Sequence, residues 1–110
     1  MEAQLEQIPT HGTVNLTIQV SAAMNYSPVV ARRLVSRFVA NEVGYLLRGG
    51  EPKLVAGTRL VWRVPVLLAL PKRRITGEVG TIDVDVETGQ LLITPQQIDA
   101  MIANGERFAA

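Results

Sequence analysis

The chain has 110 residues, of which 47% are hydrophobic and 19% charged, and a formal net charge of +1. This length fits one domain with a core large enough to fold without metals or disulfides. The absence of cysteine excludes disulfides, thiolate metal sites and cysteine nucleophiles. The acidic, non-apolar N-terminal stretch favours a cytoplasmic protein, and no apolar run is long enough to predict a membrane span.

Charge is divided unevenly along the chain. Residues 28–74 hold ten basic and two acidic residues, whereas the remainder holds one basic and eight acidic residues. The simplest consequence of such a division is that the two parts neutralise each other within the fold or across a dimer.

The N-terminal part divides into an arm and a strand. Residues 1–12 lack a hydrophobic period and contain Pro9 and Gly12, so we expect a flexible arm before one domain over 13–110. Residues 13–20 alternate apolar and polar side chains, which predicts a half-buried strand.

A long helix is expected over residues 28–48. Ser27 is a suitable cap, and Pro28 suits the first helical position. Apolar residues then recur every three or four positions as far as Leu47, and Gly49-Gly50 is typical of a helix end.

Two long strands and a short one follow. Alternation over 59–70 places Trp62 and Val64 on one face and Arg63 on the other, and Pro65 indicates an edge or a bulge. A charged turn leads to a strand over 79–86. Matching the inward faces places Trp62 opposite Val84 and Arg63 opposite Asp83.

A hairpin turn and a helix complete the chain. Gly89 supplies the positive φ of the turn over 87–90, and residues 91–93 form the short strand. Thr94 and Gln97 have the spacing of a capping box for a short C-terminal helix. The predicted class is α+β, in the order β-α-β-β-β-α, with an antiparallel sheet of about four strands, the long helix on one face and the short C-terminal helix.

Chemistry-bearing residues are few. Asp83 and Asp85 share a strand face and are the only weak metal candidates, although a solvated face explains them more simply. His11 lacks nucleophile partners, and Trp62 fits a core position. We therefore predict no enzymatic activity, no cofactor and no metal.

A basic surface supports an alternative reading as a nucleic-acid-associated regulator. On the predicted helix three arginines form a stripe, and a turn adds three more basic residues; the set is Arg33, Arg37, Arg48, Lys72, Arg73 and Arg74. With aromatic residues at 5%, a stacking platform for single strands is not expected. A binder of a small ligand or metal is a further alternative.

The strand 59–70 is apolar on both faces, which suggests self-association. The long helix covers one face only, leaving a second apolar set: Val61, Pro65, Leu67 and Ala69. The C-terminal helix or a second subunit would have to cover this set, and a two-fold dimer is the usual symmetry. The favoured function is therefore a non-enzymatic protein-binding or regulatory module that forms a homodimer.

Residues 29–93 resemble a PepSY-type, cystatin-like domain. The shared features are a helix, then a strand that carries Trp62, then a strand that ends in Val84-Asp85-Val86-Glu87-Thr88-Gly89. This resemblance implies an inhibitory or interaction module with no catalytic residues. Two departures are the strand over 13–20 that precedes the helix and the lack of the export signal that is usual in that family.

Overall fold

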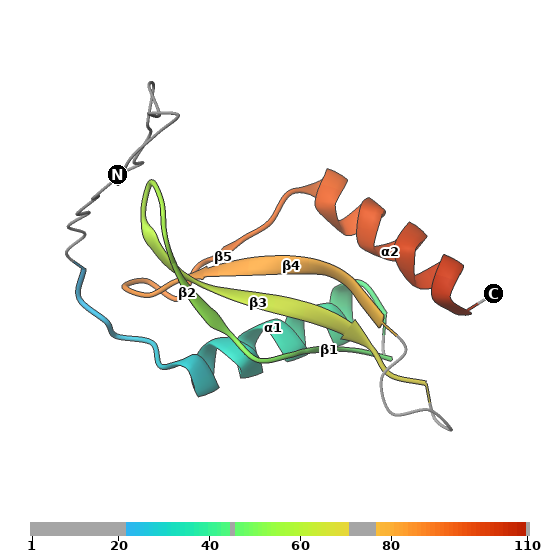
Figure 1. Ribbon diagram of the computed structural model, residues 1–110, viewed down its shortest axis with the longest axis horizontal. Helices are drawn as coiled ribbons and strands as arrows, with labels where there is room; N and C mark the ends of the chain where they lie inside the picture. The colour runs from blue at the N-terminus through green and yellow to red at the C-terminus, as the bar shows by residue number, and fades with distance from the viewer. Residues whose placement is uncertain (1–21, 45, 71–76, 110) are drawn as a thin grey trace, which may run out of the picture.

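The computed structural model describes residues 22–44, 46–70 and 77–109. The elements are α1 (Pro28–Glu42), β1 (Leu47–Gly49), β2 (Lys53–Ala56), β3 (Leu60–Leu68), β4 (Gly77–Asp85), β5 (Leu91–Leu92) and α2 (Pro95–Ala109). The strands form one antiparallel sheet in the order β1-β3-β4-β5, with β2 also paired to β3 (Figure 1). The α+β class, the antiparallel sheet and the two helices are confirmed. The arm 1–12, the strand 13–20 and the turn 71–74 lie outside the described residues.

Helix α1 begins as the sequence predicts. The Ser27 hydroxyl accepts a hydrogen bond from the Val30 amide at 3.2 Å, and Pro28 occupies the first turn. Ala31, Val35 and Val39 are fully buried against the sheet, so α1 covers the inner face, which is the face turned away from the viewer in Figure 1.

The predicted end of this helix at Arg48 is wrong, because α1 ends at Glu42. Val43 leaves the helical conformation at φ −121°, and the amides of Val43 and Gly44 both donate to the Val39 carbonyl. Leu47–Gly49 then pairs with β3 as strand β1. The spacing of Leu46 and Leu47 fits a helix, but Leu47 is buried and pairs with β3 as part of the sheet. Gly49-Gly50 therefore lies beyond the helix and does not end it.

Strands β1 and β2 form an interrupted edge beside β3, and Pro65 lies opposite the interruption. Gly49 pairs with Val66 and Lys53 with Arg63, which leaves residues 50–52 between the two segments. The Gly50 amide donates to the Pro65 carbonyl at 2.7 Å. In a strand the amide and carbonyl of one residue face the same neighbour, so the amide that proline lacks faces this break. Pro65 is therefore not on an edge strand, because β3 has neighbours on both sides, and the irregularity closest to it in the ladder with β4 is the register shift between Val66 and Leu67.

The register of β3 on β4 is the predicted one from Val61 to Val66, after which it shifts by one residue, so that Leu67 pairs with Glu78. Trp62 pairs with Val84 and Arg63 with Asp83, and the Val86 amide donates to the Leu60 carbonyl. Val64, Ile82 and Val84 are fully buried on the inner face. Trp62 is half-buried rather than fully enclosed, and its indole N–H donates to the Tyr26 carbonyl at 2.8 Å.

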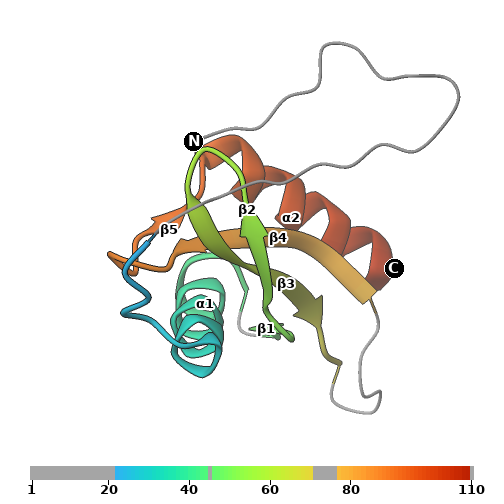
Figure 2. The same ribbon diagram turned by 60° about the vertical axis from the view of Figure 1, so that its left-hand side comes forward.

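Helix α2 is as long as α1, at 15 residues, and lies beside β4 in both views (Figures 1 and 2). The capping box is confirmed: the Thr94 amide donates to Gln97 Oε1, and the Gln97 amide donates to Thr94 Oγ1. The turn before it holds Gly89 at φ +74°, also as predicted. Met101 is 2% exposed and joins the same core as α1, and Asn104 Nδ2 donates to the Val79 carbonyl. Helix α2 therefore extends the inner core along β4.

The close approach of α1 to β1 at Gly49 gives a stability prediction. A Cβ at Gly49 would lie 3.0 Å from the Arg32 carbonyl oxygen and 3.1 Å from Val64 Cγ1, so Gly49→Ala forces helix and strand apart. We expect a loss of about 1–3 kcal/mol in the free energy of unfolding, measured by urea denaturation. Gly57→Ala is the control, because a Cβ there meets nothing within 4 Å, and it should change stability by less than about 0.5 kcal/mol. Equal losses in both variants would contradict the packing argument.

Candidate functional site

The candidate site is the outer face of the sheet, which faces away from α1. The alternation of β3 directs Val61, Arg63, Pro65 and Leu67 to this face, beside Asp83 and Asp85 of β4. Neither helix lies over β3 here, since α1 packs on the inner face and α2 packs beside β4. Among the described elements, no second layer covers the outer face.

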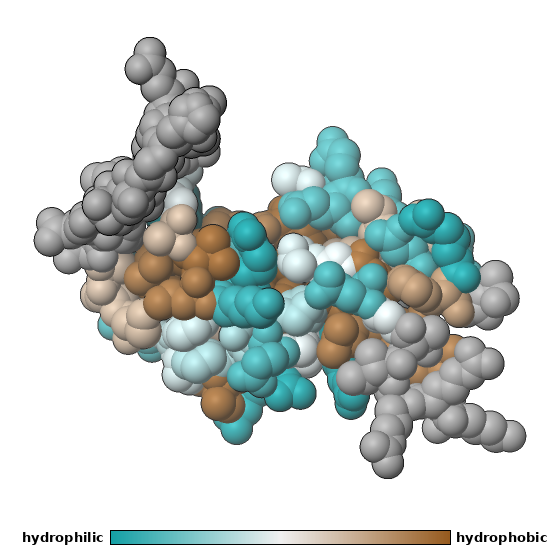
Figure 3. Space-filling view, viewed as in Figure 1, coloured by the Kyte–Doolittle hydropathy of each residue, from teal (hydrophilic) through white to brown (hydrophobic). Residues whose placement is uncertain are grey.

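The apolar set predicted for an interface is partly accessible. Pro65, Leu67 and Ala69 are half-buried, whereas Val61 is only 5% exposed. Val61 lies between Val55 of β2 and Asp85 of β4 in the register, so it belongs to the interior of the chain more than to a docking surface. The accessible apolar residues on this face are Val55, Pro65, Leu67, Ala69 and Leu92. Figure 3 shows hydrophobic surface over β2 and smaller hydrophobic patches among hydrophilic side chains.

Charges on the outer face are ordered by strand. Arg48, Lys53 and Arg63 lie on β1, β2 and β3, whereas Glu78 and Asp83 lie on β4. Arg63 meets Asp83 in the predicted cross-strand pair, with Nε–Oδ1 at 2.9 Å and a second contact of 3.1 Å to Oδ2. Hydrogen bonding to Asp83 raises the pKa of Arg63, which keeps the guanidinium charged. One side of the face is thus basic and the other acidic.

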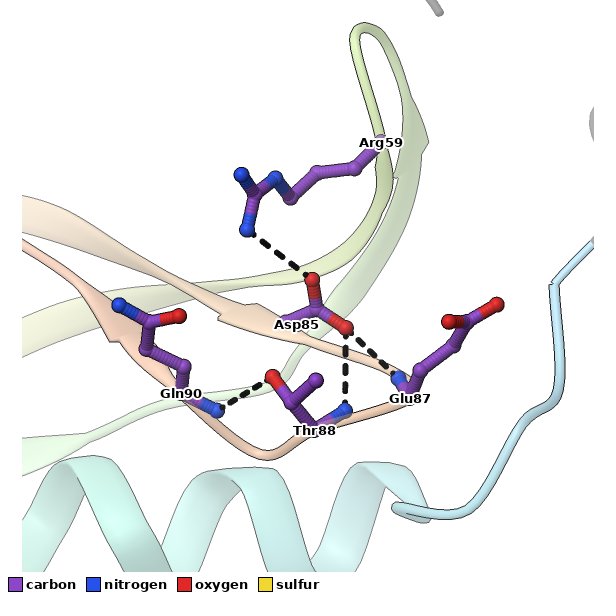
Figure 4. Close-up of polar contacts among 5 residues, drawn as sticks. All are labelled: Arg59, Asp85, Glu87, Thr88 and Gln90. Carbon is purple, nitrogen blue, oxygen red and sulfur yellow. Dashed lines mark hydrogen bonds and ion pairs between the residues drawn. The ribbon is translucent and has the colours of Figure 1, made fainter.

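Asp85 is not the solvated side chain that alternation suggested, because it is 7% exposed. Oδ1 accepts hydrogen bonds from the Glu87 amide at 2.8 Å and the Thr88 amide at 3.1 Å, and Oδ2 accepts from Arg59 Nη1 at 3.2 Å (Figure 4). Burial on its own raises the pKa of Asp85, but the two amides and the Arg59 guanidinium together outweigh it and lower the pKa. Asp85 therefore acts as an ionised clasp between the β4–β5 turn and the start of β3.

The two metal candidates point to different partners. Asp83 binds Arg63 and Asp85 binds Arg59, so each carboxylate has its own guanidinium partner. Within the described residues no three acidic or histidine side chains are grouped to hold a metal ion. His11 lies outside the described part of the chain.

The predicted basic stripe is divided by the early end of α1. Arg33 and Arg37 are exposed on α1, whereas Arg48 is exposed on β1. Its neighbours Leu47 and Gly49 are buried toward α1, so Arg48 faces the opposite side of the sheet. Lys72, Arg73 and Arg74 lie outside the described residues. The structure therefore does not bring these candidates together into one helical surface.

A groove of about 250 Å³ lies where the end of α1, β1 and α2 meet. Its lining is mostly apolar, from residues that include Val43, Leu46, Met101 and Ile102, and Glu106 is its single charged residue among those described. Such a lining lacks the convergent polar groups that orient a specific small ligand.

Sequence reasoning missed three residues of the outer face: Lys53, Arg59 and Glu78. Lys53 was missed because strand β2 was not predicted. The signal for it is that Lys53-Leu54-Val55-Ala56 is followed by a Gly-Thr turn, which is typical of a hairpin. The role of Arg59 depends on Asp85, its partner 26 positions away, and has no local signal.

Comparisons with known proteins do not assign the chain to a family. No family model, no curated protein and no solved structure matches the chain. The resemblance to PepSY-type domains stays a prediction. No helix in the described part of the chain has the length and hydrophobicity that crossing a membrane requires.

The clasp at Asp85 gives a prediction about stability and pH. We expect Asp85→Ala to lower the free energy of unfolding by about 1.5–3 kcal/mol at neutral pH, because charge-assisted hydrogen bonds are lost. Asp83→Ala should cost only about 0.2–1 kcal/mol, since its pair with Arg63 is more exposed.

The sign of the pH dependence follows from the lowered pKa of Asp85. The folded state binds this proton less readily than the unfolded state, so the contribution is complete above the unfolded value of about 3.9 and is lost as the pH falls below it. Urea denaturation at pH 7 and at decreasing pH below about 4 should show the gap between the wild-type protein and Asp85→Ala closing. A gap that is independent of pH would contradict the ionised clasp.

Proposed function

We propose that the chain is a non-enzymatic protein-binding module that acts as a homodimer through the outer face of its sheet. The observation that carries this proposal is an outer face that no described element covers, with accessible Pro65, Leu67 and Ala69 on and beside β3. Apolar side chains that stay accessible on a sheet face suit an interaction site.

The state of the acidic groups supports a binding role over a hydrolytic one. General acid catalysis requires a carboxyl group whose pKa is raised toward the working pH. The pKa of Asp85 is shifted the opposite way, and Asp83 is held by Arg63. Both carboxylates are occupied by arginines that stabilise the sheet, so neither is free to act as a catalytic acid. This arrangement favours a docking role for the outer face.

Nucleic-acid binding receives less support. Electrostatic binding to a phosphate backbone favours basic side chains gathered on one surface. Arg33 and Arg37 project from α1, whereas Arg48 lies on the outer face of the sheet, beside acidic β4.

Sedimentation equilibrium at about 1–100 µM tests the proposal, a range that suits an interface of modest size. We expect a reversible increase from the chain mass of 12.0 kDa to twice that mass. Leu67→Glu should abolish the increase, because it places a charge in the centre of the apolar set, while circular dichroism still shows a folded chain.

Val29→Glu is the matched control. Val29 is 57% exposed on α1, away from the outer face, so the same type of substitution should leave the dimer intact. A wild-type protein that stays at 12.0 kDa over the whole range would refute the homodimer.

A further inference from the structure

The strand register makes the outer face complementary in charge to a second copy of itself. Arg48, Leu67 and Glu78 form one row across β1, β3 and β4, and Lys53, Arg63 and Asp83 form a parallel row across β2, β3 and β4. In the first row Arg48 lies on one side of β3 and Glu78 on the other. In the second row Lys53 and Asp83 lie on the two sides, with Arg63 between them on β3. Within one chain, the ends of a row are two strand spacings apart, about 10 Å, so they attract each other weakly.

We infer that two copies pack face to face about a two-fold axis that runs along β3. This inference rests on the proposed function and specifies the geometry of its interface. Rotation about such an axis keeps every residue in its own row and exchanges the two sides of β3. Arg48 of one copy then faces Glu78 of the other copy. In the same way, Lys53 of one copy faces Asp83 of the other.

The alternative axis, at right angles to the strands, is disfavoured. Rotation about that axis would reverse the order of the rows but would leave each residue on its own side of β3. The basic strands β1 and β2 of one copy would then lie over β1 and β2 of the other copy. Like charges placed opposite each other across an interface are disfavoured, whereas the axis along β3 places Arg48 and Lys53 opposite acidic residues and stacks Pro65 and Leu67 against their own symmetry mates. Arg63 also meets its symmetry mate near this axis, but each Arg63 guanidinium is paired with Asp83 of its own chain.

The size of the face fits a reversible dimer. The five strands hold 27 residues, each of which covers about 3.3 Å along its strand and about 4.8 Å between strands. Two such faces bury on the order of 900 Å² in total, which is the size of a weak, transient interface. The side chains also bridge the gap, because packed sheets lie about 10 Å apart, within the combined reach of an arginine and a glutamate.

A charge exchange in the full chain tests this geometry by sedimentation equilibrium. We expect Arg48→Glu alone and Glu78→Arg alone each to raise the dissociation constant at least about ten-fold, since each places like charges opposite each other. The double variant Arg48→Glu with Glu78→Arg should return the constant to within about three-fold of the wild-type value, because the row is restored with its signs exchanged. Circular dichroism confirms that each variant is folded.

Arg37→Glu is the matched control, because it changes the net charge equally on the exposed side of α1. It should leave the dissociation constant within about two-fold of wild type. If Arg48→Glu behaves like Arg37→Glu, or if the double variant fails to restore association, the axis along β3 is wrong even though the dimer stands.

Failure of the proposed function itself has a different signature. A wild-type protein that is monomeric throughout overturns both proposals. If Leu16→Glu with Ile18→Glu then converts this monomer to a dimer, the occupant of the outer face is the segment 13–20 of the same chain. If it stays monomeric, the second copy is excluded as the occupant.

Discussion

The structure depends on the pairing of β3 with a neighbour on each side. Its register with β4 aligns Val64 with Ile82 and Trp62 with Val84 on the inner face, and these alignments create the surface that α1 and Met101 cover. A slip of one residue would turn every buried side chain of β3 outward. The same register fixes which charges meet on the outer face, so the core and the candidate site are set by one alignment.

Local chemistry made much of this architecture predictable. Ser27 and Thr94 cap the two helices as their sequence contexts indicate, and Gly89 adopts the positive φ that the hairpin requires. The pair between Arg63 and Asp83 follows from matching the inward faces of two strands across a turn. Each of these features depends on residues close in sequence or on simple alternation.

The features that sequence reasoning missed depend on contacts between distant segments. Leu46 and Leu47 continue the helical spacing of α1, and only the pairing of Leu47–Gly49 with β3 shows that they belong to the sheet. Gly49 is explained by the approach of α1, where Ser36 Oγ accepts a hydrogen bond from the Gly49 amide. The burial of Asp85 likewise requires Arg59 and two turn amides, and alternation alone places it in solvent. As a result, the fold class and the β3–β4 part of the outer face were predictable from the sequence, whereas the contributions of β1 and β2 and the contacts of Asp85 were not.

The break opposite Pro65 has a consequence for solubility. An uninterrupted strand at the border of a sheet offers a continuous row of free amides and carbonyls, onto which further chains can add without limit. Here that border consists of a three-residue and a four-residue segment with a proline at position 52 between them, so no long template is presented. Growth by strand addition is thereby discouraged on this border, which protects the chain from open-ended aggregation there.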